Sequence, residues 1–157
     1  MKKFSLTDVI ISILAAELVG AAAALLSGSF RDFYSELVKP PLSPPPAVFP
    51  VVWAILYALM GISAYIIYAS YDSSTERSTA LGLYVTQLAV NFSWTLIFFR
   101  FRLIGAAMFV AILLFILVLA MILSFRKVRP IAAWLNVPYL LWALFAAYLS
   151  VGFSILN

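Results

Sequence analysis

The sequence contains no histidine and no cysteine. Without cysteine the chain forms no disulfide and has no thiolate nucleophile, and without histidine it has no imidazole base. Sites for soft metal ions and haem ligated by histidine or cysteine are excluded for the same reason. Any ligand must be held by apolar contacts, aromatic stacking, amides, hydroxyls, tyrosines or the few charged groups, and we expect no metal and no cofactor.

Charged residues are also scarce, because they make up 10% of the 157 residues while 66% are hydrophobic. Soluble domains average about 25% charged and about 45–50% apolar residues. A water-soluble fold of this size has too small an interior for so much apolar surface, and the mean hydropathy is +1.11. The chain is therefore predicted to be an integral membrane protein.

Five apolar stretches are long enough to cross a bilayer as helices, which takes roughly 20 residues. They are predicted over residues 6–26, 47–69, 81–99, 104–125 and 131–156. All connectors except residues 27–46 are tight, so consecutive helices should be antiparallel neighbours. We expect one all-α domain over residues 1–157, a bundle of five transmembrane helices.

The first stretch shares features with a signal peptide, namely two lysines, an apolar run and small residues at 21–24. It has the length of a full span, however, and Glu17 lies in its middle. A retained helix is therefore expected.

The positions of lysine and arginine predict how the chain crosses the membrane. The side of the N-terminus carries Lys2, Lys3, Arg77, Arg126, Lys127 and Arg129, and the opposite side carries Arg31, Lys39, Arg100 and Arg102. Cytoplasmic loops are enriched in these residues, so the N-terminus is predicted to be cytoplasmic. The short basic N-terminus without transit-peptide features favours a bacterial plasma membrane. The net charge of +4 is spread over loops, which indicates contacts with lipid headgroups and not a nucleic-acid surface.

Residues 39–53 read K-P-P-L-S-P-P-P-A-V-F-P-V-V-W and contain six of the eight prolines. Each proline ring fixes φ, removes an N–H donor and biases the preceding residue to an extended form. The cluster cannot be helix interior, so a stiff Pro-rich loop is predicted at residues 27–46. Such a loop is suited to hold a fixed shape over a site.

The third stretch carries two amides and an indole on one helical face, because Gln87, Asn91 and Trp94 are spaced by four and three residues. Polar groups in hydrocarbon usually face a bundle interior or a cavity. They are either interhelical hydrogen-bonding groups or ligand contacts, and the spacing alone leaves both open. Glu17 is likewise either a proton or cation site or a neutralised carboxyl group facing a neighbouring helix.

Aromatic residues followed by small ones recur on two further stretches. The second stretch has Trp53, Tyr57 and Gly61, and the fifth has Tyr139, Trp142, Ala143 and Ala146 just after Pro138, which should kink the helix. Rings beside small residues leave a flat-walled slot between the second, third and fifth spans, suited to a large planar apolar ligand. The alternative is an interfacial aromatic belt at the helix ends.

Small residues at four-residue spacing lie on one face of the third stretch. Gly82 and Thr86 form one such pair. Faces of this kind let membrane helices approach closely, so a second copy of the chain could pack there.

Four motifs together resemble the translocator protein family, also called tryptophan-rich sensory proteins or peripheral benzodiazepine receptors. They are F-Y-S-E-L-V-K-P-P-L-S-P-P at Phe33–Pro45, F-P-V-V-W-A-I-L-Y-A-L-M-G at Phe49–Gly61, Q-L-A-V-N-F-S-W-T-L-I-F-F at Gln87–Phe99 and P-Y-L-L-W-A-L-F-A-A-Y-L at Pro138–Leu149. They occur in the order and spacing of the family over nearly the full chain, so the combination is highly specific.

The resemblance implies a five-helix bundle, usually a homodimer, that binds porphyrins such as protoporphyrin IX and related large apolar ligands below the first loop. It implies a role in their transport, sensing or breakdown, and benzodiazepine receptor activity in some members. The ligand-binding residues predicted from the motifs and the resemblance are Tyr34, Trp53, Tyr57, Gln87, Asn91, Trp94, Tyr139, Trp142 and Ala146. Gly82 and Thr86 would lie on the dimer face.

The chain departs from the family pattern at three places. The loop pair that is usually Trp-Tyr is Phe33-Tyr34, a common loop Trp is Leu42, and the Leu-Asn pair near the C-terminus is Leu149-Ser150. The basic and aromatic tail associated with cholesterol recognition in animal members is also absent. A tetrapyrrole is therefore favoured over a sterol.

Two other functions stay open. One, implied by the resemblance, is a light-dependent porphyrin-degrading enzyme in which Trp53 and Trp142 are the catalytic residues. The sequence itself has no conventional acid–base or nucleophile arrangement. The other is a small proton-coupled exporter, with Glu17 as the coupling group.

Overall fold

The structure is a computed structural model of the whole chain and describes residues 4–71 and 74–157. Its elements are α1 (Leu6–Ser27), α2 (Phe30–Glu36), α3 (Val48–Tyr68), α4 (Ser74–Thr95), the π-helical segment η1 (Leu96–Arg100), α5 (Ile104–Val128), α6 (Pro130–Leu135) and α7 (Val137–Leu156). Within the described residues there are five membrane-length apolar helical segments and no strand. The predicted all-α, five-span membrane fold is confirmed. Lys2 and Lys3, used for the predicted orientation, lie outside the described residues.

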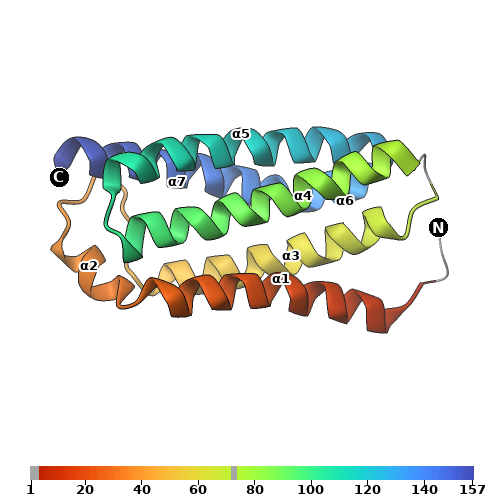
Figure 1. Cartoon of the computed structure of the whole chain (residues 1–157), viewed down its shortest axis with the longest axis horizontal. Helices are drawn as coiled ribbons and strands as arrows, with labels where there is room; N and C mark the ends of the chain where they lie inside the picture. The colour runs from red at the N-terminus through yellow and green to blue at the C-terminus, as the bar shows by residue number, and fades with distance from the viewer. Residues whose placement is uncertain (1–3, 72–73) are drawn as a thin grey trace.

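The helices lie side by side along the long axis of the molecule (Figure 1). Helix α1 packs along α3 and also contacts α4, while α5 packs against α4 on one side and α7 on the other. The short helix α6 joins this ring by contacting α3 and α5. Helix α2 and the loop after it cover the end of the bundle at which α7 ends, opposite the N-terminus (Figure 1).

The five spans differ in detail from the predicted ranges. They are Leu6–Ser27, Val48–Tyr68, Thr75–Arg100, Ile104–Val128 and Pro130–Leu156. The third begins well before residue 81, because polar residues continue the helix beyond the apolar stretch. The fifth is interrupted at Asn136, and Pro138 lies in the first turn of α7, where its missing N–H costs no intrahelical hydrogen bond.

The buried Asn136 side chain stabilises the break between α6 and α7. Asn136 is fully buried, and its Nδ2 donates to Ser63 Oγ at 2.8 Å and to the Ala132 carbonyl at 2.9 Å. The first bond joins the α6–α7 junction to α3. The second caps the end of α6, so one side chain both ends a helix and positions it.

The predicted loop at residues 27–46 contains one helix that the proline pattern did not indicate. Residues 30–36, which precede the prolines, form α2, whereas the proline-rich residues 37–47 are non-helical. Helix α3 begins at Val48 with Pro50 in its first turn. Proline is tolerated there, since the first N–H groups of a helix have no intrahelical acceptor.

Helices α1 and α3 make backbone contact at Gly61. A Cβ atom on Gly61 would lie 2.5 Å from Ile13 Cα and 2.8 Å from the Ser12 carbonyl oxygen. At the same place Ser12 Oγ donates to the Gly61 carbonyl at 2.7 Å. Helices in a bilayer gain little from the hydrophobic effect when they associate, so close backbone packing and interhelical hydrogen bonds stabilise their contact instead.

Replacing Gly61 by alanine should force α1 away from α3, because the added methyl group would overlap backbone atoms that no rotamer change can move. Overpacking of this kind costs about 1–3 kcal/mol. We expect Gly61→Ala to lower the thermal unfolding temperature in detergent. The matched control is Gly105→Ala, whose Cβ meets no atom within 4 Å; equal unfolding temperatures for the two variants would contradict the close contact.

Candidate functional site

The loop over the bundle end, residues 37–47, is anchored on the end of α7 and is called the lid below. The Asn157 side chain bonds both backbone groups of Val38, since the Val38 N–H donates to Oδ1 at 2.9 Å and Nδ2 donates to the Val38 carbonyl at 3.0 Å. Tyr148 Oη donates to the Pro41 carbonyl at 2.8 Å. These bonds hold the lid in one place relative to α7.

The lid turns sharply between Pro40 and Ser43. The Ser43 N–H donates to the Pro40 carbonyl at 3.3 Å, and Leu42 has a positive φ of 68°, as the third residue of a type II turn requires. A Cβ atom on Gly152 would lie 2.6 Å from Pro40 Cβ, so glycine in α7 lets the turn approach. The Leu42 side chain is 83% exposed and therefore points away from the bundle.

Tyr34, the predicted lid contact on α2, closes the bundle from within. It is 1% exposed, and its hydroxyl donates to the Pro44 carbonyl at 2.6 Å. Its ring packs edge-on against Phe49 at 5.3 Å and Phe153 at 5.9 Å between centroids. Burial raises the pKa of the Tyr34 hydroxyl above its ordinary value of 10.0, so the group stays a hydrogen-bond donor at neutral pH.

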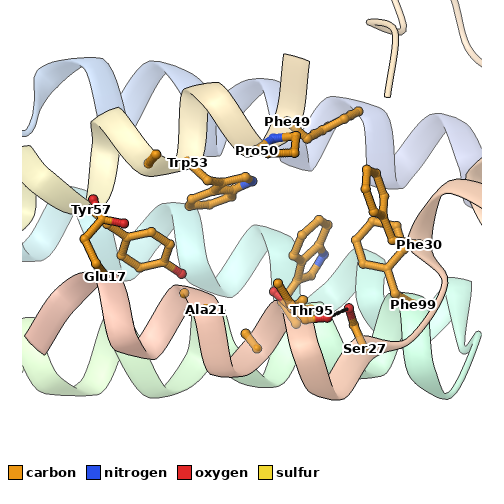
Figure 2. Close-up of a pocket in the computed structure, with 15 residues that line it drawn as sticks. Glu17, Ala21, Ser27, Phe30, Phe49, Pro50, Trp53, Tyr57, Thr95 and Phe99 are labelled. Carbon is orange, nitrogen blue, oxygen red and sulfur yellow. Dashed lines mark hydrogen bonds between the residues drawn. The ribbon is translucent and has the colours of Figure 1, made fainter. Parts of the chain in front are cut away.

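Two cavities are lined by Trp53, and the larger of them has a volume of about 270 Å³ and lies below the lid between α1, α3 and α4. Figure 2 shows Trp53 and Tyr57 of α3 on one side and Ala21 of α1 on the other, with Glu17 beside Tyr57 at one end and Phe30 at the end nearer the lid. Glu17 is the only acidic group among the described residues that line it, and it is the group that the exporter hypothesis requires.

A second cavity of about 20 Å³ lies between α3, α4 and α7, where the slot was expected from the sequence, and is called the slot below. The structure brings five predicted ligand residues together around it, namely Tyr34, Trp53, Trp94, Trp142 and Ala146. The slot is thus far smaller than the cavity beside α1. A separate, more open groove of about 380 Å³ lies between α3 and α7 and is lined in part by Trp142.

Four aromatic side chains line both cavities and form the wall between them, called the aromatic partition below. They are Phe49, Trp53, Trp94 and Phe99. The Trp94 ring lies edge-on to Phe99 at 6.0 Å between centroids. The partition is formed by aromatic side chains, so its position depends on their rotamers.

Gln87 and Tyr139 lie behind the cavity walls. Both are fully buried, and Tyr139 Oη donates to Gln87 Oε1 at 2.6 Å, while Gln87 Nε2 lies 3.6 Å from Met60 Sδ. Neither is among the described residues that line the two cavities. The pair links α4 to α7 as an interhelical hydrogen bond, and its contact with a ligand stays a prediction.

Asn91 does not line the larger cavity but bonds Tyr57, which does. Asn91 Nδ2 donates to Tyr57 Oη at 2.9 Å, and Tyr57 lines the cavity while Asn91 does not. Asn91 Oδ1 is buried without a hydrogen-bond partner among the described residues. The amide therefore positions the tyrosine hydroxyl that a ligand would meet.

Sequence reasoning missed the wall supplied by α1 and the phenylalanines near the lid. Ala21, Ala23 and Ala24 line the larger cavity, and a Cβ on Gly20 would collide with the Tyr57 ring. One signal for this wall is present in the sequence, the run of small residues at 21–24, but it fits a signal peptide equally well. Phe99, a member of the partition, lies in the π-helical segment η1. No sequence pattern predicted that this segment would be π-helical.

Gly82 and Thr86 lie apart from both cavities. Both are exposed on α4, and Thr86 Oγ1 donates to the Gly82 carbonyl at 2.8 Å within the helix. The face at Gly82 and Thr86 is exposed and carries only small side chains. Its contact with a second copy of the chain stays a prediction.

Removing the Tyr34 hydroxyl should loosen the lid, because the Pro44 carbonyl then loses its donor. Such a bond contributes about 0.5–1.5 kcal/mol. We expect Tyr34→Phe to speed hydrogen–deuterium exchange of lid amides by roughly two- to tenfold, measured by mass spectrometry of peptides from residues 37–47. Tyr71→Phe is the control, since Tyr71 is 70% exposed. Lid exchange at the wild-type rate in Tyr34→Phe would show that the bond does not hold the lid.

Comparison with known protein sequences places this chain in a family. Residues 10–156 match the model of the TspO/MBR family. The chain is 39% identical to the translocator protein of Ovis aries over 126 residues, which cover 80% of this chain and 75% of that protein. It is 36% identical to the tryptophan-rich protein TspO of Chlorobaculum tepidum over 125 residues, 80% of this chain and 79% of that protein. Protein CrtK of Rhodobacter capsulatus is 33% identical over 153 residues, 98% of this chain and 94% of that protein. The chain therefore belongs to the TspO/MBR family of membrane proteins.

Proposed function

We propose that the protein binds porphyrins of the protoporphyrin IX type and related large planar apolar ligands below the lid, and acts in their transport, sensing or breakdown. The observation that carries this proposal is the aromatic partition between the two cavities. Two of its members, Trp53 and Trp94, are indoles, whose wide faces suit stacking on a flat ring system.

The volumes imply that the partition moves when such a ligand binds. The cavities measure about 270 and about 20 Å³, whereas ligand pockets usually enclose about 300–1,000 Å³. Ring contacts of the partition contribute only about 0.5–1.5 kcal/mol per pair. Stacking on the face of a tetrapyrrole would replace them, so opening the partition costs little once a ligand is present.

We also propose the orientation and assembly that the sequence predicts. Arg77, Arg126, Lys127 and Arg129 lie at the end of the bundle opposite the lid, which favours a cytoplasmic N-terminus. The exposed face at Gly82 and Thr86 supports a homodimer, and the bacterial relatives favour a bacterial plasma membrane. The lid then lies outside the cell, and Arg31, Lys39, Arg100 and Arg102 near it could meet carboxylates at the rim of a porphyrin.

Two substitutions test the ligand site. Trp53→Phe shrinks the partition, and Asn91→Ala removes the donor to the Tyr57 hydroxyl. We expect each to raise the Kd for protoporphyrin IX about five- to tenfold, the effect of losing one aromatic or hydrogen-bond contact. Binding is followed by porphyrin absorption and tryptophan quenching. Trp134→Phe is the control because Trp134 is 73% exposed on α6; wild-type affinity in both site variants would refute the assignment.

Light-dependent porphyrin breakdown is a second candidate, favoured because the two tryptophans assigned to it are among the three indoles that line the slot. Trp53 and Trp142 both line it, and Trp142 packs against Phe49 with 5.9 Å between centroids. A photoexcited porphyrin held there would lie within contact of two oxidisable side chains, with dissolved oxygen as the oxidant.

Illumination separates the two candidates. Protein with bound protoporphyrin IX is illuminated in air, and the porphyrin absorption band is followed with time. If breakdown depends on the two indoles, the band should disappear several-fold more slowly in Trp53→Phe/Trp142→Phe than in wild type at equal porphyrin occupancy, with Trp134→Phe as the control. Equal rates in all three proteins would leave binding without catalysis.

A further inference from the structure

Two buried polar atoms of residues that line the slot have no hydrogen-bond partner among the described residues. They are Trp94 Nε1 on α4 and Ser150 Oγ on α7. Trp94 is 8% exposed and Ser150 is 1% exposed, and both side chains line the same volume of about 20 Å³. The two residues come from different helices, so their position on one cavity is a feature of the tertiary structure. Trp94 also lines the larger cavity.

The rest of the slot gives these atoms no hydrogen-bond partner. Its other walls include Leu149, Phe98 and Phe153, which are apolar. Tyr34 also lines it, and its hydroxyl oxygen could accept a bond while donating to the Pro44 carbonyl, but neither atom bonds to it. Buried N–H and O–H groups are nearly always hydrogen-bonded, because leaving them unpaired costs the desolvation free energy. Something other than the surrounding side chains must therefore satisfy them.

The chemistry of the two groups selects the occupant. An indole N–H is only a donor, while a serine hydroxyl both donates and accepts, so the occupant must present an acceptor atom. A volume of about 20 Å³ accommodates one oxygen atom, since a bound water needs about 10–15 Å³ by the same measure. The described residues that line the slot include no cation, which disfavours a carboxylate because a buried unpaired charge is costly.

We propose that Trp94 and Ser150 form a subsite for a single uncharged oxygen atom. A water molecule occupies it in the ligand-free protein. A neutral carbonyl oxygen on the edge of a related planar ligand, such as a porphyrin ester, displaces that water, whereas the carboxylates of protoporphyrin IX do not enter the subsite. The ligand half of this inference rests on the proposed function, whereas the water half does not. Tyr34 lines the same slot, so the subsite would fix which edge of a planar ligand faces the lid.

The ligand half is tested with two porphyrins that differ only in their oxygen-bearing substituents. Mesoporphyrin IX dimethyl ester carries two ester carbonyls, and etioporphyrin carries only alkyl groups. We expect Trp94→Phe and Ser150→Ala each to raise the Kd for the diester roughly three- to tenfold, as for one lost hydrogen bond, and to change the Kd for etioporphyrin less than about twofold. Ser93→Ala is the control, since Ser93 is exposed and its hydroxyl bonds the Ala89 carbonyl.

The outcomes separate this inference from the proposed function. Equal weakening of both porphyrins would mean that the variants act through packing, which overturns the subsite. Wild-type affinity for the diester in both variants also overturns it. If neither porphyrin binds the wild-type protein, the proposed function fails together with the ligand half, and the water half is decided by the ligand-free experiment.

The experiment on the ligand-free protein asks whether Ser150→Ala raises or lowers the unfolding temperature. If water links the two groups, Ser150→Ala loses a hydrogen bond and lowers the unfolding temperature in detergent, and it shifts the Trp94 indole N–H resonance in a ¹⁵N-resolved NMR spectrum. If the hydroxyl is unpaired, its removal relieves a penalty and raises the unfolding temperature. A raised temperature, or an unmoved Trp94 resonance with Ser93→Ala as the reference, would overturn the shared water.

Discussion

The requirement that polar groups inside a membrane bundle find partners on other helices is the constraint on which this structure depends. Three buried hydrogen bonds meet it, Asn91 to Tyr57, Tyr139 to Gln87 and Asn136 to Ser63. Together they tie α3, α4 and the α6–α7 segment at different depths. Between helices in lipid there is little hydrophobic driving force, so these bonds and the backbone contact at Gly61 determine which faces meet.

The same hydrogen bonds determine which side-chain groups remain available to a ligand. The amides of Gln87 and Asn91 are engaged by tyrosines, so the surfaces that face the cavities are mainly aromatic rings and small residues of α1. Above them the lid is held by Tyr34, Tyr148 and Asn157. A site of this kind binds through shape and ring contacts, and its few unpaired polar atoms then control orientation.

Most of the fold follows from patterns that are local in the sequence. Long apolar stretches predict the spans, and the prolines predict the non-helical lid. Helix α2 and the early start of α4 were not predicted, because residues 30–36 and 75–80 are polar enough to read as connector. The stripe of Gln87, Asn91 and Trp94 was recognised, but spacing alone could not separate interhelical bonding from ligand contact. The structure pairs Gln87 with Tyr139 across helices and leaves the Trp94 indole on the slot.

The sequence by itself determined the membrane environment, the number of spans and the family, because hydropathy, proline chemistry and motif order are properties of the linear chain. Only the tertiary structure decided where the cavities lie. The larger one opens beside α1 because that helix presents alanines opposite Trp53, and the expected slot is narrow because rings from α2, α3, α4 and α7 meet in it. The volume between helices depends on which side chains face each other across them, and that pairing is set by contacts between residues far apart in the chain.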